Sequence, residues 1–562
     1  MSTSRPGTRI LSHVFTTDHR KLGILYLYLS LAAVIVGTIL SLMMRIHRVW
    51  PNMMVPGIGL IKPEDYLAMV TMHGTLMVFF VLLIAPQAGF ANLVLPEQIG
   101  ARRMAFPRIN AAAFWISVVA FLVLISGAHV KGGSAISGWS SYPPLSALPA
   151  AGPGQGLGMD LWLISIAIFC IASWLSAVNF LATILGERRA GMTWSRLPMT
   201  VWGWLVTSIL SLLIFAVLLA AAVLLFSDRH FGSSFFIPMG DMIDGRIVGH
   251  GDGSPLLWLH LFWFFGHPGT YLAVLPGMGL ATSLFANFTR RRFAGYKVMA
   301  GGLVAIGGLG LLVWGHHMFV SGMNHYAGSA FALISMAIAV PSTIEVIGWL
   351  AMLWGGGFRL KTPMLFALGF LSFFIVGGLS GPILAQPALD TYLHNTFFVV
   401  AHFHMVMGMA GIFTLFAGVY YWFPLMTGRM MNETLGKLHF WISLIAAYGT
   451  FLPMHFAGLA GEPRHYDRLA GPATSFHMLI PLERGITYSA GLLAAAQLIF
   501  FWNVFASARR GRLAEENPWQ ASTLEWADEP AVGRIEVGPY DYELESGGKG
   551  FHPQWETAVK GE

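Results

Sequence analysis

The feature that most constrains the fold of this chain is a series of twelve apolar runs, each long enough to cross a lipid bilayer. They cover roughly residues 22–43, 68–94, 109–128, 161–183, 200–226, 254–283, 296–320, 328–355, 363–383, 395–425, 437–459 and 488–508. A bilayer core requires about 20 apolar residues per helix. Only 11% of the residues are charged, compared with about 25% in soluble proteins. We therefore predict an all-α membrane protein with twelve transmembrane helices and exclude a soluble helical protein.

Basic residues concentrate in alternate loops, which sets the expected orientation. The loops after the even-numbered runs contain Arg102, Arg103 and Arg108; Arg188, Arg189 and Arg196; Arg290, Arg291, Arg292 and Lys297; Arg359 and Lys361; Arg429 and Lys437; and Arg509, Arg510 and Arg512. Positively charged loops stay in the cytoplasm. We therefore expect both termini to be cytoplasmic, in a protein of the bacterial inner membrane.

Three segments follow from this orientation. Residues 1–21 form a cytoplasmic segment without the cleavage site of a secretory signal. Residues 22–508 form the twelve-helix domain, and residues 509–562 form a polar, irregular cytoplasmic tail that we expect to be exposed. The net charge of +6 is spread over loops and tails, so no nucleic-acid partner is expected. The single cysteine, Cys170, excludes a covalently attached haem and a cysteine copper site.

Six of the histidines inside apolar runs, and a seventh just before one, lie in motifs that suggest metal binding. The six are His73, His267, His316, His317, His402 and His404, and the seventh is His394. Ionisable groups at membrane depth usually mark function, and neutral imidazole is a common ligand of iron and copper. One such histidine is often a hydrogen-bonded core residue, but six are improbable in that role. The histidines therefore indicate metal centres.

Helical spacing separates these histidines into groups. Residues two apart point about 200° away from each other, so His402 and His404 are expected to face two different centres. His316 and His317 are about 100° apart and reach one ion only if their helix is distorted. His267 and Tyr271 share a helix face, and Pro268 between them predicts an irregular turn.

The motifs around these histidines resemble those of subunit I of the haem-copper oxidase superfamily. The matching strings are MHGTLMVFF, IGARRMAFPR, SGWSSYPPLS, HLFWFFGHPGTY, WGHHMF, VVAHFHMVM, EPRHY and NPWQASTLEW, and they extend to about residue 530. The resemblance implies the twelve-helix fold of that subunit, with two haems, of type A or a related type, and one copper ion.

The resemblance also implies a role for each ligand residue. His73 and His404 would be the axial ligands of a low-spin haem, and His402 the single axial ligand of a high-spin haem. His267, His316 and His317 would hold the copper. Tyr271 resembles the tyrosine that is covalently joined to the first copper ligand and supplies an electron and a proton.

Further family positions lie near the outer face of the haems. Arg464 and His465 match a pair that contacts haem propionates, although the family has arginine at the second position. Trp139 is expected near the haems. His394 matches a ligand of a magnesium site, but Asn395 replaces the usual aspartate, which puts that site in doubt.

Two carboxylates of a proton route in the family are absent. Arg103 stands where the family has the aspartate that opens the route, and Gly269 stands where it has the relaying glutamate. On the eighth apolar run, Glu345 replaces a lysine. Because a buried carboxyl can carry protons, Glu345 and Ser342 are the candidate proton route, whereas the alternative is a Glu345 that only reaches the inner interface.

Three functions are compatible with the twelve predicted helices. Reduction of O2 to water is favoured by Tyr271 and three copper-type histidines. Reduction of nitric oxide by a divergent superfamily member would suit the lost carboxylates, whereas a solute transporter would leave the membrane histidines unexplained. The expected partners are a subunit II with an electron-accepting copper site, a subunit III or small membrane subunits, cytochrome c as donor and membrane lipid.

Overall fold

The computed structural model describes residues 15–55, 59–239, 242–243, 246–247, 251–291, 293, 295–471, 474–527, 533–542 and 552–555. Within these residues, twelve helices are long and apolar enough to cross a membrane. They are His19–Val49, Pro63–Gln98, Pro107–His129, Leu157–Gly186, Met199–His230, Pro255–Thr289, Tyr296–Met318, His325–Leu353, Thr362–Leu384, Phe397–Thr427, Glu433–Leu459 and Phe476–Arg510. The predicted all-α membrane fold is confirmed.

Six spans are single α-helices and the other six are composite. The single helices are α2 (His19–Val49), α6 (Leu157–Gly186), α7 (Met199–His230), α8 (Pro255–Thr289), α12 (Thr362–Leu384) and α16 (Glu433–Leu459). The composite spans join α3 (Pro63–Thr75), η1 (Leu76–Leu82), η2 (Ala85–Gly89) and α4 (Phe90–Gln98); α5 (Pro107–Ser126) and η3 (Gly127–His129); α9 (Tyr296–Gly310) and η6 (Trp314–Met318); α10 (His325–Ala337) and α11 (Ala339–Leu353); α14 (Phe397–Phe403), η7 (His404–Met409) and α15 (Ala410–Thr427); and η8 (Phe476–Leu479) and α17 (Ile480–Arg510). Of these segments, η1, η2 and η7 are π-helical.

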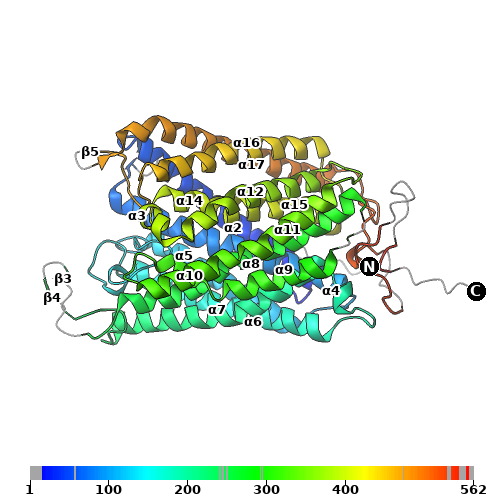
Figure 1. Ribbon diagram of the computed structural model, residues 1–562, viewed down its shortest axis with the longest axis horizontal. Coiled ribbons are helices and arrows are strands. Elements are labelled where there is room, and N and C mark those ends of the chain that lie inside the picture. Colours follow the sequence, from blue (N-terminus) through cyan, green and yellow to red (C-terminus); the bar gives the residue numbers. More distant parts are fainter. Residues whose placement is uncertain are drawn as a thin grey trace, which may run out of the picture.

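The connections are short helical turns and three two-stranded antiparallel hairpins. The turns are η4 (Leu145–Ala147), η5 (Trp194–Arg196), α13 (Pro387–Leu393) and η9 (Leu524–Trp526). The hairpins pair β1 (Met54–Val55) with β2 (Gly59–Leu60), β3 (Met242–Ile243) with β4 (Arg246–Ile247), and β5 (Ala470–Gly471) with β6 (Thr474–Ser475). Each hairpin follows an odd-numbered span, so all three lie at the same end of the bundle, at the left in Figure 1. We call this the hairpin end and the opposite end the tail end.

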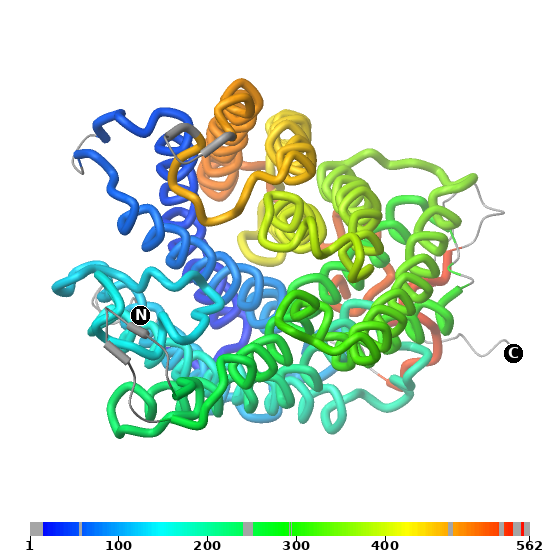
Figure 2. The backbone as a smooth tube through the Cα atoms, turned by 60° about the vertical axis from the view of Figure 1, so that its left-hand side comes forward, coloured from blue at the N-terminus to red at the C-terminus, as the bar shows by residue number. Residues whose placement is uncertain are grey.

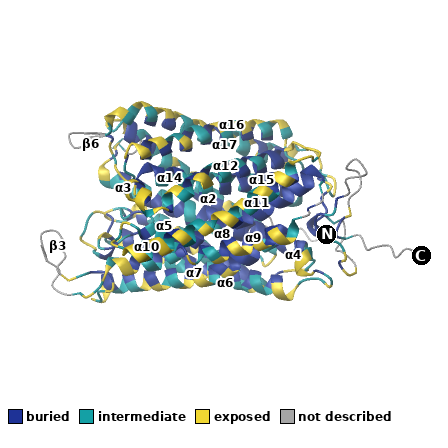
Figure 3. Ribbon diagram, in the orientation of Figure 1, coloured by how far each residue is buried: buried dark blue, intermediate teal, exposed yellow. Residues whose placement is uncertain are grey.

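The bundle is organised around α8, the sixth span. All of its most apolar 18-residue window is buried, compared with 22% for α2 and 17% for α17. Figure 2 shows that α2 and α17, the first and last spans, lie side by side. Figure 3 shows exposed residues along the outer edges of the bundle and buried ones inside. The sparsely covered spans therefore face lipid or partner chains, and α8 places its side chains at the centre.

Close contact between helices depends on glycine at particular positions. A Cβ at Gly279 of α8 would overlap the carbonyl oxygen of Met199, the first residue of α7. A Cβ at Gly458 of α16 would overlap the backbone nitrogen of Phe398 in α14. These contacts bring neighbouring backbones together and fix the helices that carry the histidines.

The described part of the C-terminal tail is irregular, as predicted, but not generally exposed. Tyr540 OH accepts a hydrogen bond from the backbone nitrogen of Met199 at 2.8 Å and lies 2.6 Å from Ser283 Oγ. Gln554 donates to the carbonyl of Arg196 at 2.9 Å. The expectation of an exposed tail was wrong here because its aromatic residues bury apolar area between α7 and α8.

Candidate active site

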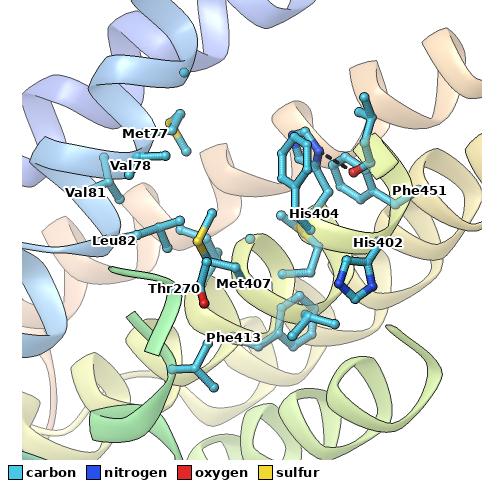
Figure 4. A pocket seen from close by; sticks show the side chains of 18 of the residues that line it. Met77, Val78, Val81, Leu82, Thr270, His402, His404, Met407, Phe413 and Phe451 are labelled. Atoms are coloured by element: carbon cyan, nitrogen blue, oxygen red, sulfur yellow. Dashed lines mark hydrogen bonds between the residues drawn. The ribbon is translucent and has the colours of Figure 1, made fainter. Parts of the chain in front are cut away.

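A cavity of about 1250 Å³ extends through the bundle and is lined by the six histidines that were predicted to bind metal, His73, His267, His316, His317, His402 and His404. Its lining also includes most of the other predicted site residues, namely Tyr271, Ser342, His394, Arg464, His465 and Trp139. Figure 4 shows the part of the cavity around His402 and His404. The structure thus brings together, in one cavity, predicted site residues that lie on five of the twelve spans and on the connections at the hairpin end.

Three histidines converge within this cavity on one point. His267 of α8 and the pair His316–His317 each offer a ring nitrogen, and these atoms lie within 4.8 Å of one another. In the described part of the chain this is the one group of three such residues with metal-ligand spacing. His316 and His317 lie in the tight 3₁₀ turn η6, after α9 has ended at Gly310. The predicted distortion of the helix is therefore present.

Neighbouring side chains orient the three rings. Ser335 Oγ lies 2.8 Å from His316 Nδ1, which leaves Nε2 free. Trp263 stacks on His317 with ring centroids 3.8 Å apart. His267 Nδ1 lies 3.1 Å from His317 Nε2. Two ring nitrogens this close must share a proton or an ion, so a copper ion fits the donor set.

The other nitrogen of His267 faces Tyr271. Its Nε2 lies 3.1 Å from Tyr271 OH, as the shared helix face predicted. The tyrosine ring rests against Gly310, where an added Cβ would lie 2.6 Å from the ring. Pro268 lies inside α8, which continues through it although the proline removes one backbone hydrogen bond.

The side chains of His402 and His404 point to different sides of one helical segment (Figure 4). His402 Nδ1 lies 2.8 Å from Ser380 Oγ and 3.1 Å from the Gly377 carbonyl, both on α12. His404 begins the π-helical segment η7, and its Nδ1 donates to the Val400 carbonyl at 2.8 Å. Each Nε2 is left free, which supports the prediction that this helix separates two centres.

His404 forms a parallel pair with His73 of α3. The ring centroids lie 6.5 Å apart at an interplanar angle of 14°. His73 Nδ1 donates to the Gly37 carbonyl at 2.8 Å, so both Nε2 lone pairs remain available in the gap. Two metal–nitrogen bonds of about 2 Å plus two ring radii span about 6 Å. The pair therefore fits axial ligation of one haem iron.

The remaining predicted residues lie at the hairpin-end edge of the cavity. Trp139 packs against Gly74 and the ring of Phe262. Arg464 has a buried Nε without a partner among the described residues, which suits contact with an anionic group such as a propionate. His394 Nδ1 lies 3.0 Å from Asp390 Oδ2. Among the described residues, neither of these two belongs to a group of three side chains with metal-ligand spacing.

Glu345 lies beside the cavity rather than in its lining. Its side chain is fully buried in α11, and neither carboxyl oxygen has a described hydrogen-bond partner. Ser342 and Val346, three residues before and one residue after, do line the cavity. The absence of a side chain at Gly302 makes room for Glu345 Oε1.

Several residues of the site were not predicted from the sequence. Ser335 and Ser380 bind ring nitrogens of two ligand histidines, and nothing distinguishes them from other serines in apolar runs. Arg45 and Arg48 of α2 also line the cavity. In the sequence both arginines lie just beyond the first predicted apolar run, 22–43, so a search for polar residues inside the runs missed them.

Comparison with known proteins agrees with this geometry. The family model described as Cytochrome C and Quinol oxidase polypeptide I matches residues 21–514. The alternative cytochrome c oxidase subunit 1 of Bradyrhizobium diazoefficiens is 40% identical over 553 residues, covering 96% of this chain and 92% of the relative. The cytochrome c oxidase subunit 1 of Synechocystis is 40% identical over 541 residues, covering 95% and 93%. A haem-copper terminal oxidase dimer solved by electron cryo-microscopy has the same fold, with a TM-score of 0.68 and 19% identity over 91% of this chain and 88% of that one.

Proposed function

The chain belongs to the cytochrome c and quinol oxidase polypeptide I family, the catalytic subunits of terminal oxidases, and we propose on this premise that it reduces O2 to water with electrons from cytochrome c. One observation favours O2 reduction over nitric oxide reduction. The three-histidine cluster has metal-ligand spacing, and Tyr271 OH lies 3.1 Å from one of its members. Such a cluster can hold copper, and a phenol beside it can supply a proton and an electron.

The histidines would hold two haems and one copper ion, which supply the electron transfer and oxygen chemistry. His73 and His404 would bind the low-spin haem, and His402 the high-spin haem next to the copper ligands. Ser335 and Ser380 fix ring orientations, and Trp263 shields His317 from solvent. Arg464, His465 and Trp139 would contact the haem edges. His394 and Asp390 would contribute to a magnesium site.

We assign proton delivery to Glu345, Ser342 and Tyr271. Glu345 lies against Gly302 and Tyr271 against Gly310 on the same helix, α9. Eight residues of helix place these contacts about 12 Å apart, with Ser342 along the cavity wall between them. Water in the cavity would complete the connection. We expect no proton transfer along the family's other route, because Arg103 and Gly269 stand where that route has carboxylates.

The charge pattern and the family membership support a placement of the chain in the membrane and a set of partner subunits. We place residues 22–508 in the bacterial inner membrane, with residues 1–21 and 509–562 in the cytoplasm, because the arginine-rich loops lie at the tail end. The low cover of the outer spans leaves room for a copper-bearing subunit II and a subunit III or small membrane subunits.

The function is tested by turnover of the purified complex with O2 and, separately, with nitric oxide. We expect O2 consumption with reduced cytochrome c and about one copper per two haems in this subunit. Iron at the three-histidine site, with turnover of nitric oxide in preference to O2, would contradict the proposal and assign the chain to nitric oxide reduction.

A covalent link between His267 and Tyr271 is also expected. The two side chains are already in contact, and formation of a carbon–nitrogen bond would remove two hydrogen atoms, whose two electrons and two protons would pass to O2, the oxidant of the proposed reaction. Peptide mass spectrometry of the purified complex should find the 254–289 segment lighter by that amount. Tyr271→Phe should restore the mass expected for an unlinked segment. An unlinked wild-type segment in an enzyme that turns over O2 would show that the contact stays non-covalent.

A further inference from the structure

Four charged side chains are buried together at the hairpin end, outside the metal sites. Arg45 and Arg48 belong to α2, Glu483 to α17, and Glu462 to the loop after α16. Arg45 donates to Glu483 at 2.7 Å, and Arg48 donates to Glu462. Both carboxyl groups are 0% exposed, and each keeps one oxygen without a described partner. Burial of ion pairs with unsatisfied oxygens costs free energy, so a role in holding helices together does not by itself explain this cluster.

This cluster borders the cavity that contains His73 and His404. Arg45, Arg48 and Tyr66 line that cavity. Arg45 also contacts Met454 Sδ at 3.4 Å. One turn earlier on the same helix, Phe451 stacks on the His404 ring at 4.7 Å. Both arginines lie over the ring of Phe397, at 5.2 and 4.4 Å.

The backbone of Glu462 is attached to the helix that carries His404. The Phe397 nitrogen, at the start of α14, donates to the Glu462 carbonyl at 2.9 Å. Seven residues separate Phe397 from His404, or about 10 Å along a helix. For two charges about 10 Å apart in an effective dielectric constant of about 20, one added unit charge changes proton affinity by about tenfold.

Glu462 is also close to the aqueous surface. Gly461 beside it is exposed, and so is Tyr466, whose carbonyl accepts from Arg48 at 2.9 Å. Burial raises the pKa of the Glu462 carboxyl above its ordinary value, and Arg48 partly offsets this. The titratable and charged groups around it are Arg45, His47 and Arg48 of α2, Tyr66 of α3, Glu483 of α17, and Arg464, His465, Tyr466, Asp467 and Arg468 of its own loop.

We propose that the Glu462 carboxylate takes up one proton from the hairpin-end aqueous phase when one electron reaches the haem site held by His73 and His404. The proton forms an O–H bond on the carboxyl group, and the electron comes from the one-electron donor of the enzyme. Reoxidation releases both. The inference rests on the proposed function, because it requires a haem between the two histidines.

The test is a redox titration of the low-spin haem absorption in the purified complex, from about pH 5.5 to about pH 8.5. Because the reduced state favours protonation, the wild-type midpoint potential should fall as pH rises. Glu462→Gln keeps the size and hydrogen bonding of the side chain but does not titrate. In this variant the slope of midpoint potential against pH should fall to half of the wild-type slope or less. The bis-histidine absorption spectrum should stay unchanged.

Glu483→Gln is the matched control, because it removes the same charge from the neighbouring ion pair. In Glu483→Gln the midpoint potential of the low-spin haem should shift by a constant amount, while its dependence on pH keeps the wild-type slope. An unchanged slope in Glu462→Gln, or a slope lost only in Glu483→Gln, would overturn the assignment. If Glu462→Gln does not assemble, the infrared difference spectrum of the wild-type complex decides instead. Reduction should produce a protonated-carboxyl band that shifts in heavy water, and its absence overturns the inference.

The same measurement separates this inference from the proposed function. A wild-type complex without a bis-histidine haem spectrum would contradict both. A normal spectrum with a potential that does not depend on pH would contradict the role of Glu462 alone.

Discussion

Replacing His404 with alanine should abolish the low-spin haem spectrum and reduce O2 turnover to background. The His404 ring faces His73 in parallel at 6.5 Å, and its Nδ1 is already bound to the Val400 carbonyl. Alanine leaves one axial ligand where two are needed, so the iron cannot stay six-coordinate. His73→Ala should have the same effect. Absorption and electron paramagnetic resonance spectra of the purified complex measure the loss.

His439→Ala is the matched control for this pair. His439 is a fully buried histidine on α16, and it hydrogen-bonds to Gln497 at 3.1 Å. Because it lies outside the parallel pair, its removal should leave the low-spin spectrum in place. A six-coordinate bis-histidine spectrum that persisted in His404→Ala would show that the structural pair is not the ligand pair.

The sequence alone predicted the twelve spans because apolar length is a direct consequence of the bilayer. Their ends were less well predicted. The first run was placed at 22–43, whereas α2 covers His19–Val49, because Asp18 caps the helix and buried Arg45 and Arg48 extend it. Hydropathy detects the part of a helix that lipid requires, and polar residues that are satisfied inside the bundle fall outside this signal.

The candidate ligands were predictable because histidine is rare in hydrocarbon, but their geometry was only partly predictable. The opposite directions of His402 and His404 follow from helical spacing. The π-helical segment at His404 and the 3₁₀ turn at His316 depend on tertiary contacts, and no local pattern specifies them. Ser335 and Ser380 were missed for the same reason: their role exists only once a histidine of another helix is beside them.

Glu345→Gln should lower O2 turnover by about 10²–10⁴-fold, the usual contribution of a positioned proton-transfer group. The carboxyl of Glu345 is fully buried, has no hydrogen-bond partner among the described residues, and lies one turn from the cavity wall at Ser342. Glutamine has nearly the same shape but does not carry a proton. Haem spectra and copper content should therefore stay at wild-type values while the proton-coupled electron steps slow. Stopped-flow reaction of the reduced complex with O2 measures those steps separately.

Glu525→Gln provides the matched control for Glu345→Gln. Glu525 is also a buried carboxyl, but it lies at the tail end and accepts a hydrogen bond from Gln98 at 3.0 Å. Because neither Glu525 nor its partner Gln98 lines the cavity, replacement of Glu525 should leave those electron steps nearly unchanged. If Glu345→Gln instead turned over at the wild-type rate in sealed vesicles, Glu345 would be a bystander. Protons would then have to reach Tyr271 from the hairpin end, since Arg103 and Gly269 leave no carboxylate at either family position of the other inner route.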